Sequence, residues 1–562
     1  MNATGRITVL GLVLVVVGCT QPSRPAPSSS SSASATVASA APKRITVALL
    51  SDLPTFSSRL NSPLPGSSEI EDFVNAGLVT VDGDDVLHLQ LGEAIPTLEN
   101  GLWKLMPDGQ MEVTWKIRNG ARWHDGAPFT ADDLVFTMQV VRDRELPLWG
   151  DAIYLDIDSI EATDPRTLVV HWKRPTLWAD ALFSRTLAMP LPKHLLEKAF
   201  TEEKGTFAQL PYWNTAYVGV GPYKVREWVS GSHTVLDAFD GYVLGRAKID
   251  QIELKFTTDS NTLIANILSG ALDTTVGRGI SMEQAIQARD QWRDGKTEFG
   301  LSSWIAVYPQ FIDPNPAVVT NLQLRQAMLH AVDREEMVQT IQGGLVPVAH
   351  TFLRPGQAQY RDLEARATRY DYDPRRASQL VESIGYTRGG DGALRDAAGQ
   401  KLEFEVRTFD TDINRKSAFS TQDYWQRIGL GVEVVVVPTS RQRDREYQAT
   451  YPGFTQQRYL YDRNLVRAMH SSRVPVPENG YSGANNIRYI NAELDALSER
   501  YFATIPPAER IPIMEQVVRH VTQNLNVMGL FYDAQPAMIR NRLKNVPSQG
   551  LAWNVNAWEV AD

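Results

Sequence analysis

The chain has 562 residues, of which 43% are hydrophobic and 22% are charged. A chain of this length exceeds what one hydrophobic core usually supports, so we expect a soluble globular protein of two or three domains. The net charge of -9 argues against a nucleic-acid partner. The one cysteine, Cys19, leaves the rest of the chain without a disulfide, a thiolate zinc site or a cysteine nucleophile.

The first residues have the pattern of a secretory signal. Arg6 precedes the apolar run "ITVLGLVLVVV", which is too short to span a membrane comfortably and ends in "VVGC". This ending resembles a bacterial lipobox, which implies a signal peptide over residues 1–18 and lipidation of Cys19. An ordinary signal peptide with an incidental cysteine is the alternative. By the same resemblance, Thr20 after the cysteine implies sorting to an outer membrane where the cell has one.

Cys19 is followed by a tract rich in serine, alanine and proline, "TQPSRPAPSSSSSASATVASAAPK", and the segment over residues 19–42 is read together. The tract has too few large apolar residues to bury a core, so we expect a disordered tether. Its mean reach is on the order of 25 to 30 Å, which is enough to hold a domain clear of a membrane surface. No later segment has a long uncharged apolar run, so we expect the remainder to be soluble.

The stretch "RWHDGAPFTADDLVFTMQVV" places His124 beside Asp125, a pair that suits a catalytic or metal site. Its other signals are structural. Asp125 and the glycine after it predict a turn, and Thr130 with Asp133 predicts the capping box of a helix. Alternating apolar residues upstream predict a strand, and Trp123 is expected to pack inward. A strand, a turn and a capped helix are the preferred interpretation, with a catalytic pair as the alternative.

Strand-like and helix-like segments then interleave without a fixed repeat, which predicts an α/β or α+β architecture. Residues 167–172 alternate as a strand does, and residues 322–344 predict two consecutive helices. A well-capped helix is expected over 373–385. Residues 389–408 predict a hairpin whose second arm carries alternating apolar residues, and residues 432–437 predict a buried strand.

The sequence has no recognisable catalytic or cofactor motif. It has no G-x-S-x-G elbow, no Walker phosphate loop and no complete G-x-G-x-x-G fingerprint. The nine histidines are scattered, with no H-x-x-x-H pair, and "RGGDGALRDAAGQ" lacks the spaced acids and closing glutamate of an EF-hand. We therefore expect no catalytic residue, no metal site and no cofactor.

Five blocks of sequence follow one another along the chain: "TWKIRNGARWHDGAPFTADDLVFT", "GVGPYKVREWVSGSHTVLDAFDGYVLGRAKIDQIEL" with "NTLIANILSGALDTT", "LRQAMLHAVDREEMV", "YDYDPRRASQLVESIGY" and "NNIRYINAELDAL". In this order they resemble the large extracellular solute-binding proteins of bacterial ABC importers. That family contains oligopeptide-, dipeptide- and nickel-binding proteins. The blocks cover nearly the entire mature chain, and the ordered set is stronger evidence than any one block.

The resemblance implies an α/β fold, the type II periplasmic-binding-protein clamp in its large three-domain form, with two lobes and a two-strand hinge. By the positions of the matching blocks, a discontinuous lobe I takes residues 43–72, 220–302 and 528–562. A domain inserted into that lobe takes residues 73–219. The opposing lobe takes residues 303–527.

One departure from the family pattern concerns the ligand. Peptide binders of the family carry an acidic residue, in a Trp-x-x-Asp-like stretch of the opposing lobe, that pairs with the peptide α-amine. The matching segment, "YPGFTQQRYLYDRNLVRAMHSS", places Arg458 there, and a slip of a few residues would substitute Gln457, Tyr459 or Asp462. An arginine suits a carboxylate or a phosphate. An Arg458–Asp462 pair on a solvated helix remains an equal alternative.

Two aromatic residues, Trp304 and Tyr308, follow the expected hinge strand in "SSWIAVYPQ". They are further candidates for the lining of the ligand cleft. Buried aromatic side chains of a core have the same pattern, so this alternative stays open.

The function that the resemblance implies is that of a lipid-anchored, monomeric, extracytoplasmic or periplasmic binding protein. It captures a peptide or another small solute by lobe closure and delivers it to an ABC permease and ATPase. A chain with no ATP-binding loop and no membrane-spanning helix cannot transport a solute by itself, so those partners are required. The alternatives are a secreted hydrolase or metal-dependent enzyme that uses His124 and Asp125, and a lipoprotein of the same fold that serves a sensor.

Overall fold

The computed structural model describes residues 41–61, 65–146, 150–357, 361–460, 465–549 and 551–561. The predicted signal peptide, Cys19 and almost all of the tether lie outside these residues. Pro42–Asp562 form one compact unit. None of the helices in the described ranges is long and apolar enough to cross a membrane.

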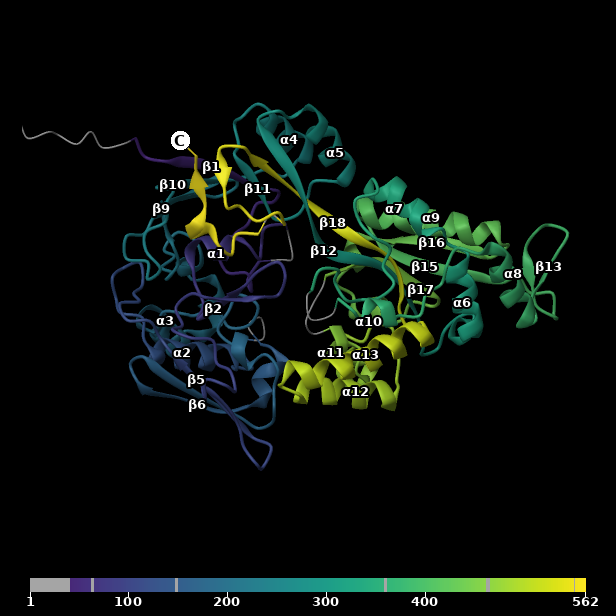
Figure 1. Ribbon diagram of the computed structural model, residues 1–562, viewed down its shortest axis with the longest axis horizontal. Helices are drawn as coiled ribbons and strands as arrows, with labels where there is room; N and C mark the ends of the chain where they lie inside the picture. Colours follow the sequence, from purple (N-terminus) through teal and green to yellow (C-terminus); the bar gives the residue numbers. More distant parts are fainter. Residues whose placement is uncertain are drawn as a thin grey trace, which may run out of the picture. The chain divides into compact units, whose positions relative to one another are not determined.

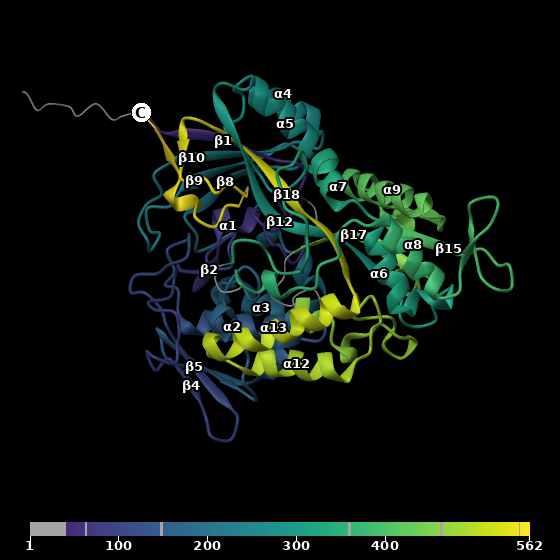
Figure 2. The ribbon, with the colours of Figure 1, turned by 45° about the vertical axis from the view of Figure 1, so that its right-hand side comes forward.

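A ten-stranded mixed sheet runs through this unit. Its strands lie in the order β16 (Gly431–Val437), β15 (Glu403–Phe409), β17 (Phe454–Leu460), β12 (Gly295–Pro309), β18 (Met528–Arg540), β11 (Thr274–Val276), β1 (Arg44–Leu49), β10 (Gln251–Phe256), β9 (His233–Ala238) and β8 (Tyr223–Val229). The two long strands at the centre, β12 and β18, pair with each other in antiparallel orientation. Figures 1 and 2 show them side by side, connecting the two halves of the sheet.

A second, antiparallel sheet has four strands, in the order β4 (Trp103–Leu105), β5 (Met111–Lys116), β7 (Thr167–Trp172) and β6 (Ile157–Asp164). Two-stranded ribbons form from β2 (Val79–Val81) with β3 (Leu87–Leu89), β13 (Thr387–Arg388) with β14 (Leu394–Arg395), and β19 (Leu543–Lys544) with β20 (Glu559–Val560). The helices are α1 (Ile70–Val74), α2 (Ala131–Val141), α3 (Lys193–Glu202), α4 (Ser260–Leu268), α5 (Met282–Gln291), α6 (Leu322–His330), α7 (Arg334–Gln342), α8 (Pro374–Ser383), α9 (Asp412–Arg427), α10 (Arg445–Ala449), α11 (Leu465–Ala468), α12 (Ala492–Ala503) and α13 (Pro507–Asn524).

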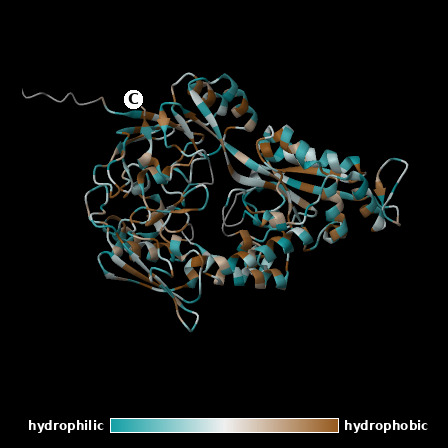
Figure 3. Cartoon of the chain, in the orientation of Figure 1, coloured by the Kyte–Doolittle hydropathy of each residue, from teal (hydrophilic) through white to brown (hydrophobic). Residues whose placement is uncertain are grey.

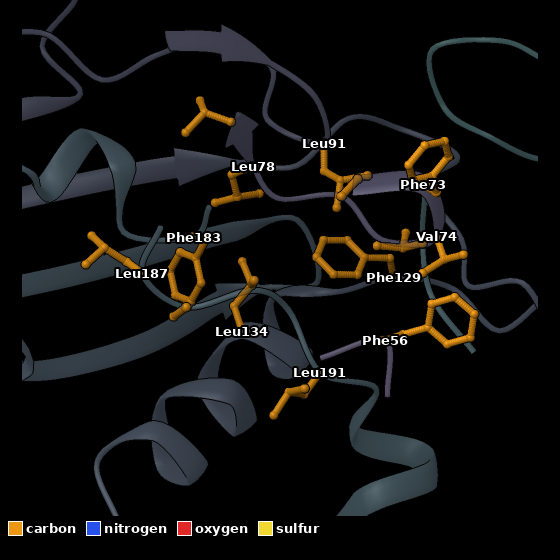
Figure 4. Close-up of a cluster of buried hydrophobic side chains, with 14 of the residues drawn as sticks. Phe56, Phe73, Val74, Leu78, Leu91, Phe129, Leu134, Phe183, Leu187 and Leu191 are labelled. Atoms are coloured by element: carbon orange, nitrogen blue, oxygen red, sulfur yellow. The ribbon is translucent and has the colours of Figure 1, made fainter. Parts of the chain in front are cut away.

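Two large apolar cores and a small one hold these elements together. The first core collects buried side chains from residues 45–276 and a few from residues 505–558. Figure 4 shows part of it, with Phe73 and Leu78 close to Phe129 and Phe183. The second core joins residues 282–534, and the third lies around α4 and α5. Figure 3 shows hydrophilic and hydrophobic residues mixed along most helices, as amphipathic elements require.

The predicted strand, turn and capped helix around His124 are confirmed. The helix α2 begins after Thr130, and the backbone N–H of Thr130 donates to Asp133 at 2.9 Å in a capping box. Trp123 is fully buried, and its Nε1 donates to Asp133 at 3.3 Å. The strand over 167–172 and the helices over 322–344 and 373–385 are confirmed as β7, α6, α7 and α8.

Two predictions about strands need correction. A hairpin forms here, but its arms are β13, just before residue 389, and β14, and the apolar arm of the prediction, β15, pairs in parallel with β16 and β17 instead. The strand over 432–437 forms as β16, but it lies at the end of the ten-stranded sheet. Its valines are therefore half-buried in the middle of the strand rather than fully enclosed.

Candidate ligand-binding site

The carboxyl ends of three strands meet at one edge of the sheet. The strands β15, β16 and β17 run parallel to one another, so Phe409, Val437 and Leu460 end at the same side. The neighbouring strand β12 runs in the opposite direction and places Ser303 directly opposite Leu460. This edge therefore lies near the middle of β12, where β12 leaves one half of the sheet for the other.

In the other half of the sheet, the carboxyl ends of the parallel strands point toward the middle of β12 and β18. The strands β1, β10 and β11 are parallel to one another. β11 is antiparallel to β18, with Thr274 opposite Ile539, so its carboxyl end points along β18 toward Asp533. Two carboxyl edges thus face each other across β12 and β18. In open α/β sheets, ligands bind outside the carboxyl ends of the strands.

A charged cluster occupies this position. Arg458, near the carboxyl end of β17, places its Nε 2.6 Å from Oδ2 of Asp533 on β18. Ser303 Oγ donates to the same carboxylate at 3.0 Å, and Gln342 Nε2 from α7 donates to it at 2.8 Å. The Asp533 side chain is only 4% exposed, whereas that of Arg458 is 29% exposed. The carboxylate is therefore fixed by donors, while the guanidinium keeps a face toward solvent.

A second arginine, Arg278, comes two residues after β11, at the carboxyl edge of the other half of the sheet. Burial and the nearby charge of Arg458 together lower the pKa of Arg278 to about 10, although Asp533 and Glu69 oppose this shift. The negative charge of Asp533 therefore acts on both guanidinium groups, and Glu69 acts on Arg278 as well. Such a cluster favours an additional anionic group.

The strand register separates the predicted site residues into two faces. Trp304 pairs with Tyr459, Tyr308 pairs with Thr455, and side chains alternate along each strand. Gln457 and Tyr459 therefore share a face with Trp304 and Tyr308, and Arg458 lies on the other face. On the shared face, Gln457 Nε2 donates to the Tyr459 hydroxyl at 2.6 Å, and the rings of Tyr308 and Tyr459 lie 4.3 Å apart.

The burial of these side chains agrees with their place in the sheet. Trp304 and Tyr308 are 2% and 5% exposed and belong to the second core. Arg458 lies in a strand, so the alternative that placed it on a solvated helix is wrong. Among the described residues, which do not include Asp462, Arg458 pairs with Asp533, 75 residues further along the chain.

Asp533, Arg278, Ser303 and Gln342 were not among the residues predicted from the sequence. Asp533 has a local signal, because it is the one acid in the mostly apolar strand "MGLFYDAQPAMIR". Arg278 stands between two glycines directly after a strand, in "VGRG". Ser303 and Gln342 had no distinguishing local pattern.

The side chains of His124 and Asp125 bind different partners. Nδ1 of His124 accepts the Gly219 N–H at 3.2 Å, and its Nε2 donates to the Gly221 carbonyl at 3.1 Å. Asp125 lies 2.7 Å from Nε2 of His194. These contacts tie the turn to neighbouring segments. Within the part of the chain that the structure describes, no group of three or more His, Cys, Asp or Glu side chains could hold a metal ion.

Replacing His124 with alanine is expected to lower the free energy of unfolding by about 0.5 to 3 kcal/mol. The change removes both hydrogen bonds between the turn and residues 219–221. Urea titration measures the loss, with His171→Ala on the surface of β7 as the control. Ligand affinity should not change. A loss of affinity at an unchanged melting temperature would assign His124 a role in binding.

The same histidine should contribute to the pH dependence of stability. Burial lowers the pKa of His124 in the folded protein from 6.5 to about 4. As the pH falls, the unfolded chain takes up this proton first, so the contribution is complete above about pH 6.5 and decreases toward pH 4. When the pH is lowered from 6.5 to 4, the free energy of unfolding of His124→Ala should therefore fall less than that of the wild type. Denaturant titrations of both proteins at the two pH values measure the difference.

The fold and the site together define a clamp-type binding protein: an α/β molecule of two lobes that β12 and β18 join, with its candidate site between the facing edges of the sheet. A model of the family described as "Bacterial extracellular solute-binding proteins, family 5 Middle" matches residues 93–472. The chain belongs to this family.

Individual relatives resemble the chain over most of its length. The oligopeptide-binding protein AppA of Bacillus subtilis (strain 168) is 25% identical over 527 residues, 90% of each chain. The structure of AppA from Bacillus subtilis with a nonapeptide gives a TM-score of 0.71 at 22% identity and covers 93% of this chain and 100% of that one. The periplasmic EDTA-binding protein EppA gives 0.75 at 16% identity, over 92% and 96% of the chains.

Proposed function

We propose that this protein is the substrate-binding lipoprotein of an ABC importer, which captures a peptide or a related small solute by lobe closure. The observation that carries the proposal is the pair of facing carboxyl edges around Arg458, Arg278 and Asp533, joined by β12 and β18. A ligand held between two such edges contacts both lobes. It therefore stabilises the closed state by its higher affinity for that state.

Contacts between distant segments support closure as the mode of capture. Gln357 Nε2 donates to Asp85 at 2.6 Å, and Arg354 lies 3.4 Å from the same carboxylate. Trp178 meets Phe502 edge to face at a centroid distance of 5.2 Å. In the proposed division, each of these contacts joins the inserted domain, residues 73–219, to the opposing lobe, residues 303–527.

The ligand that we propose carries a carboxylate or a phosphate. Named relatives bind peptides, and peptide capture is the starting expectation for this chain. Arg458 stands where peptide binders of the family are expected to carry an acid, and Arg278 adds a second positive charge. An anionic group suits this site better than a peptide α-amine. Tyr459, Gln457, Trp304 and Tyr308 stay candidates for further contacts.

A thermal-shift screen of peptides, sugars, organic acids and metal chelates tests the ligand class. A true ligand at a hundred times its dissociation constant should stabilise the protein by about 2.7 kcal/mol. The best ligands should be anionic, and none should be chemically altered after incubation. A screen in which neutral sugars stabilise the protein and anions do not would contradict the proposed ligand. Turnover of a ligand would contradict the binding-protein assignment.

The membrane attachment that we propose is a lipid on Cys19, with residues 19–42 as the tether. Replacement of Cys19 with serine is expected to abolish lipid labelling and to release the protein from the membrane fraction. The melting temperature should not change, because Cys19 precedes the folded unit that starts at Pro42. The matched control is Ser32→Ala, which changes a residue of the same tract and leaves the lipidation site intact. A membrane-bound, lipid-labelled Cys19→Ser variant would refute the anchor.

The partners that we propose are a membrane permease and an ATPase, with the binding protein acting as a monomer outside the cytoplasm. Membership of a family of extracellular solute-binding proteins supports this compartment. Co-purification of the ligand-loaded protein with a permease tests the partnership. Size-exclusion chromatography with light scattering tests the monomer.

A further inference from the structure

A cavity lies away from the candidate ligand-binding site. It has a volume of about 690 Å³ and is lined by residues 155–178, around the four-stranded sheet, and by residues 467–503, from α11 to α12. Pockets that bind small molecules have volumes of roughly 300 to 1,000 Å³. Neither Arg458 nor Asp533 lines this cavity, so it is separate from the cluster at β12 and β18.

Positive charge gathers around one buried carboxylate in this cavity. Nη2 of Arg174 lies 2.9 Å from Oδ1 of Asp156, and Nη2 of Arg467 lies 3.6 Å from Oδ2 of the same residue. The side chain of Asp156 is 12% exposed. Asp156 comes from the segment before β6, and Arg467 comes from α11, so the three groups join two parts of the fold.

A third guanidinium, that of Arg473, lines the same cavity. Across the described residues, its side chain forms neither a hydrogen bond nor an ion pair. The pKa of Arg467 is lowered by burial and by the charges of Arg174 and Arg473, while Asp156 opposes the shift. The other acid of the lining, Glu499, is 72% exposed and lies 3.4 Å from His470. Three arginines therefore line a cavity that has one buried carboxylate, that of Asp156, and two of them, Arg174 and Arg467, lie against it.

The wall of the cavity is apolar and partly aromatic. Trp178 is buried, and its ring contacts Phe502 edge to face at 5.2 Å. Leu177 and Ala503 extend the same wall. A ligand that fits both the wall and the arginines has an apolar or aromatic body and one anionic group.

We propose that this cavity is an accessory binding site for a small organic anion, in which a carboxylate or phosphate binds Arg467 and Arg473 and an apolar body packs on Trp178 and Phe502. The site goes beyond solute capture at Arg458. Its lining comes from both the four-stranded-sheet region and α11–α12, so an occupied site strengthens the contact between them. Occupancy thereby favours the closed arrangement independently of the main ligand.

Phenyl phosphate is a suitable probe, titrated calorimetrically into the complete protein. Arg473→Gln and Arg467→Gln are each expected to raise its dissociation constant roughly tenfold or more, because each removes a charge-assisted contact. Arg473→Gln should fold normally, since no described partner loses a contact. The matched control is Arg366→Gln, an exposed arginine that does not line the cavity. Phenol, which lacks the anionic group, should bind more weakly by a similar factor.

The variant Arg458→Gln separates this site from the main one. It should leave phenyl phosphate binding unchanged while it weakens the solutes found by the thermal-shift screen. The proposal is overturned if the wild type shows no saturable binding below about 10 mM. It is also overturned if Arg473→Gln binds phenyl phosphate as the wild type does, if phenol binds equally well, or if Arg458→Gln alone abolishes binding.

Discussion

Replacing Arg458 with glutamine is expected to weaken the binding of carboxylate- or phosphate-bearing ligands by roughly tenfold to a hundredfold, the loss of one hydrogen bond to a charged group. Arg458 is the partly exposed guanidinium of the site, and Asp533 holds it in place. In the variant, the anionic group of the ligand would lose this guanidinium as its partner while it remains in a poorly solvated position. Neutral analogues should be affected much less. Calorimetric titration of matched charged and neutral ligands measures the difference.

Arg415→Gln is the matched control for this experiment. Arg415 lies on α9, is 50% exposed and pairs with Asp410 at 2.9 Å. Equal weakening of charged and neutral ligands in Arg458→Gln would indicate general damage to the site. An unchanged affinity for both would show that Arg458 serves the structure through Asp533 and does not contact the ligand.

Replacing Asp533 with asparagine is expected to lower the free energy of unfolding by about 3 kcal/mol. Asparagine keeps the shape and can still bind Ser303 and Gln342, but it leaves Arg458 and Arg278 without their shared negative charge. Removal of one member of a buried charge pair costs more than the pair contributes, because the remaining charge stays desolvated. Urea denaturation with two independent probes measures the change.

Asp294→Asn provides the comparison, because Asp294 also pairs with an arginine, Arg540, but is 64% exposed. The Asp294→Asn change should alter the free energy of unfolding by no more than about 0.5 kcal/mol. The double variant Arg458→Gln/Asp533→Asn should be less destabilised than the sum of its two single variants, because it removes both charges of the pair. Strictly additive effects would show that the two side chains do not depend on each other.

Elements with local signals could be predicted from the sequence. Thr130 and Asp133 lie three residues apart and fix the start of α2, and the alternation in 167–172 gives β7 directly. The burial of β16 could not be predicted in this way. Its valines predict a strand, but its place at the end of the sheet depends on β15 and β17, which are distant in sequence.

The candidate site could be predicted only in part, for the same reason. Arg458 was found because its segment resembles a family motif. Its partner Asp533 was not, because the two meet through β12, which pairs with both of their strands. The register of β12 also puts Gln457 and Tyr459 on the opposite face from Arg458, although the three are consecutive in sequence. A displacement by one residue along a strand changes the face.

The position of β18 between β12 and β11 has a consequence for how the protein is made. β18 is formed by residues 528–540, so it leaves the ribosome after the other nine strands of this sheet. Until it arrives, β12 and β11 each keep an unpaired edge, and exposed edges are templates for pairing with other chains. The two halves of the sheet can be joined only after residues 528–540 have been synthesised. A chain that stops before Met528 would therefore be two incomplete sheets prone to aggregation, rather than a slightly shortened binding protein.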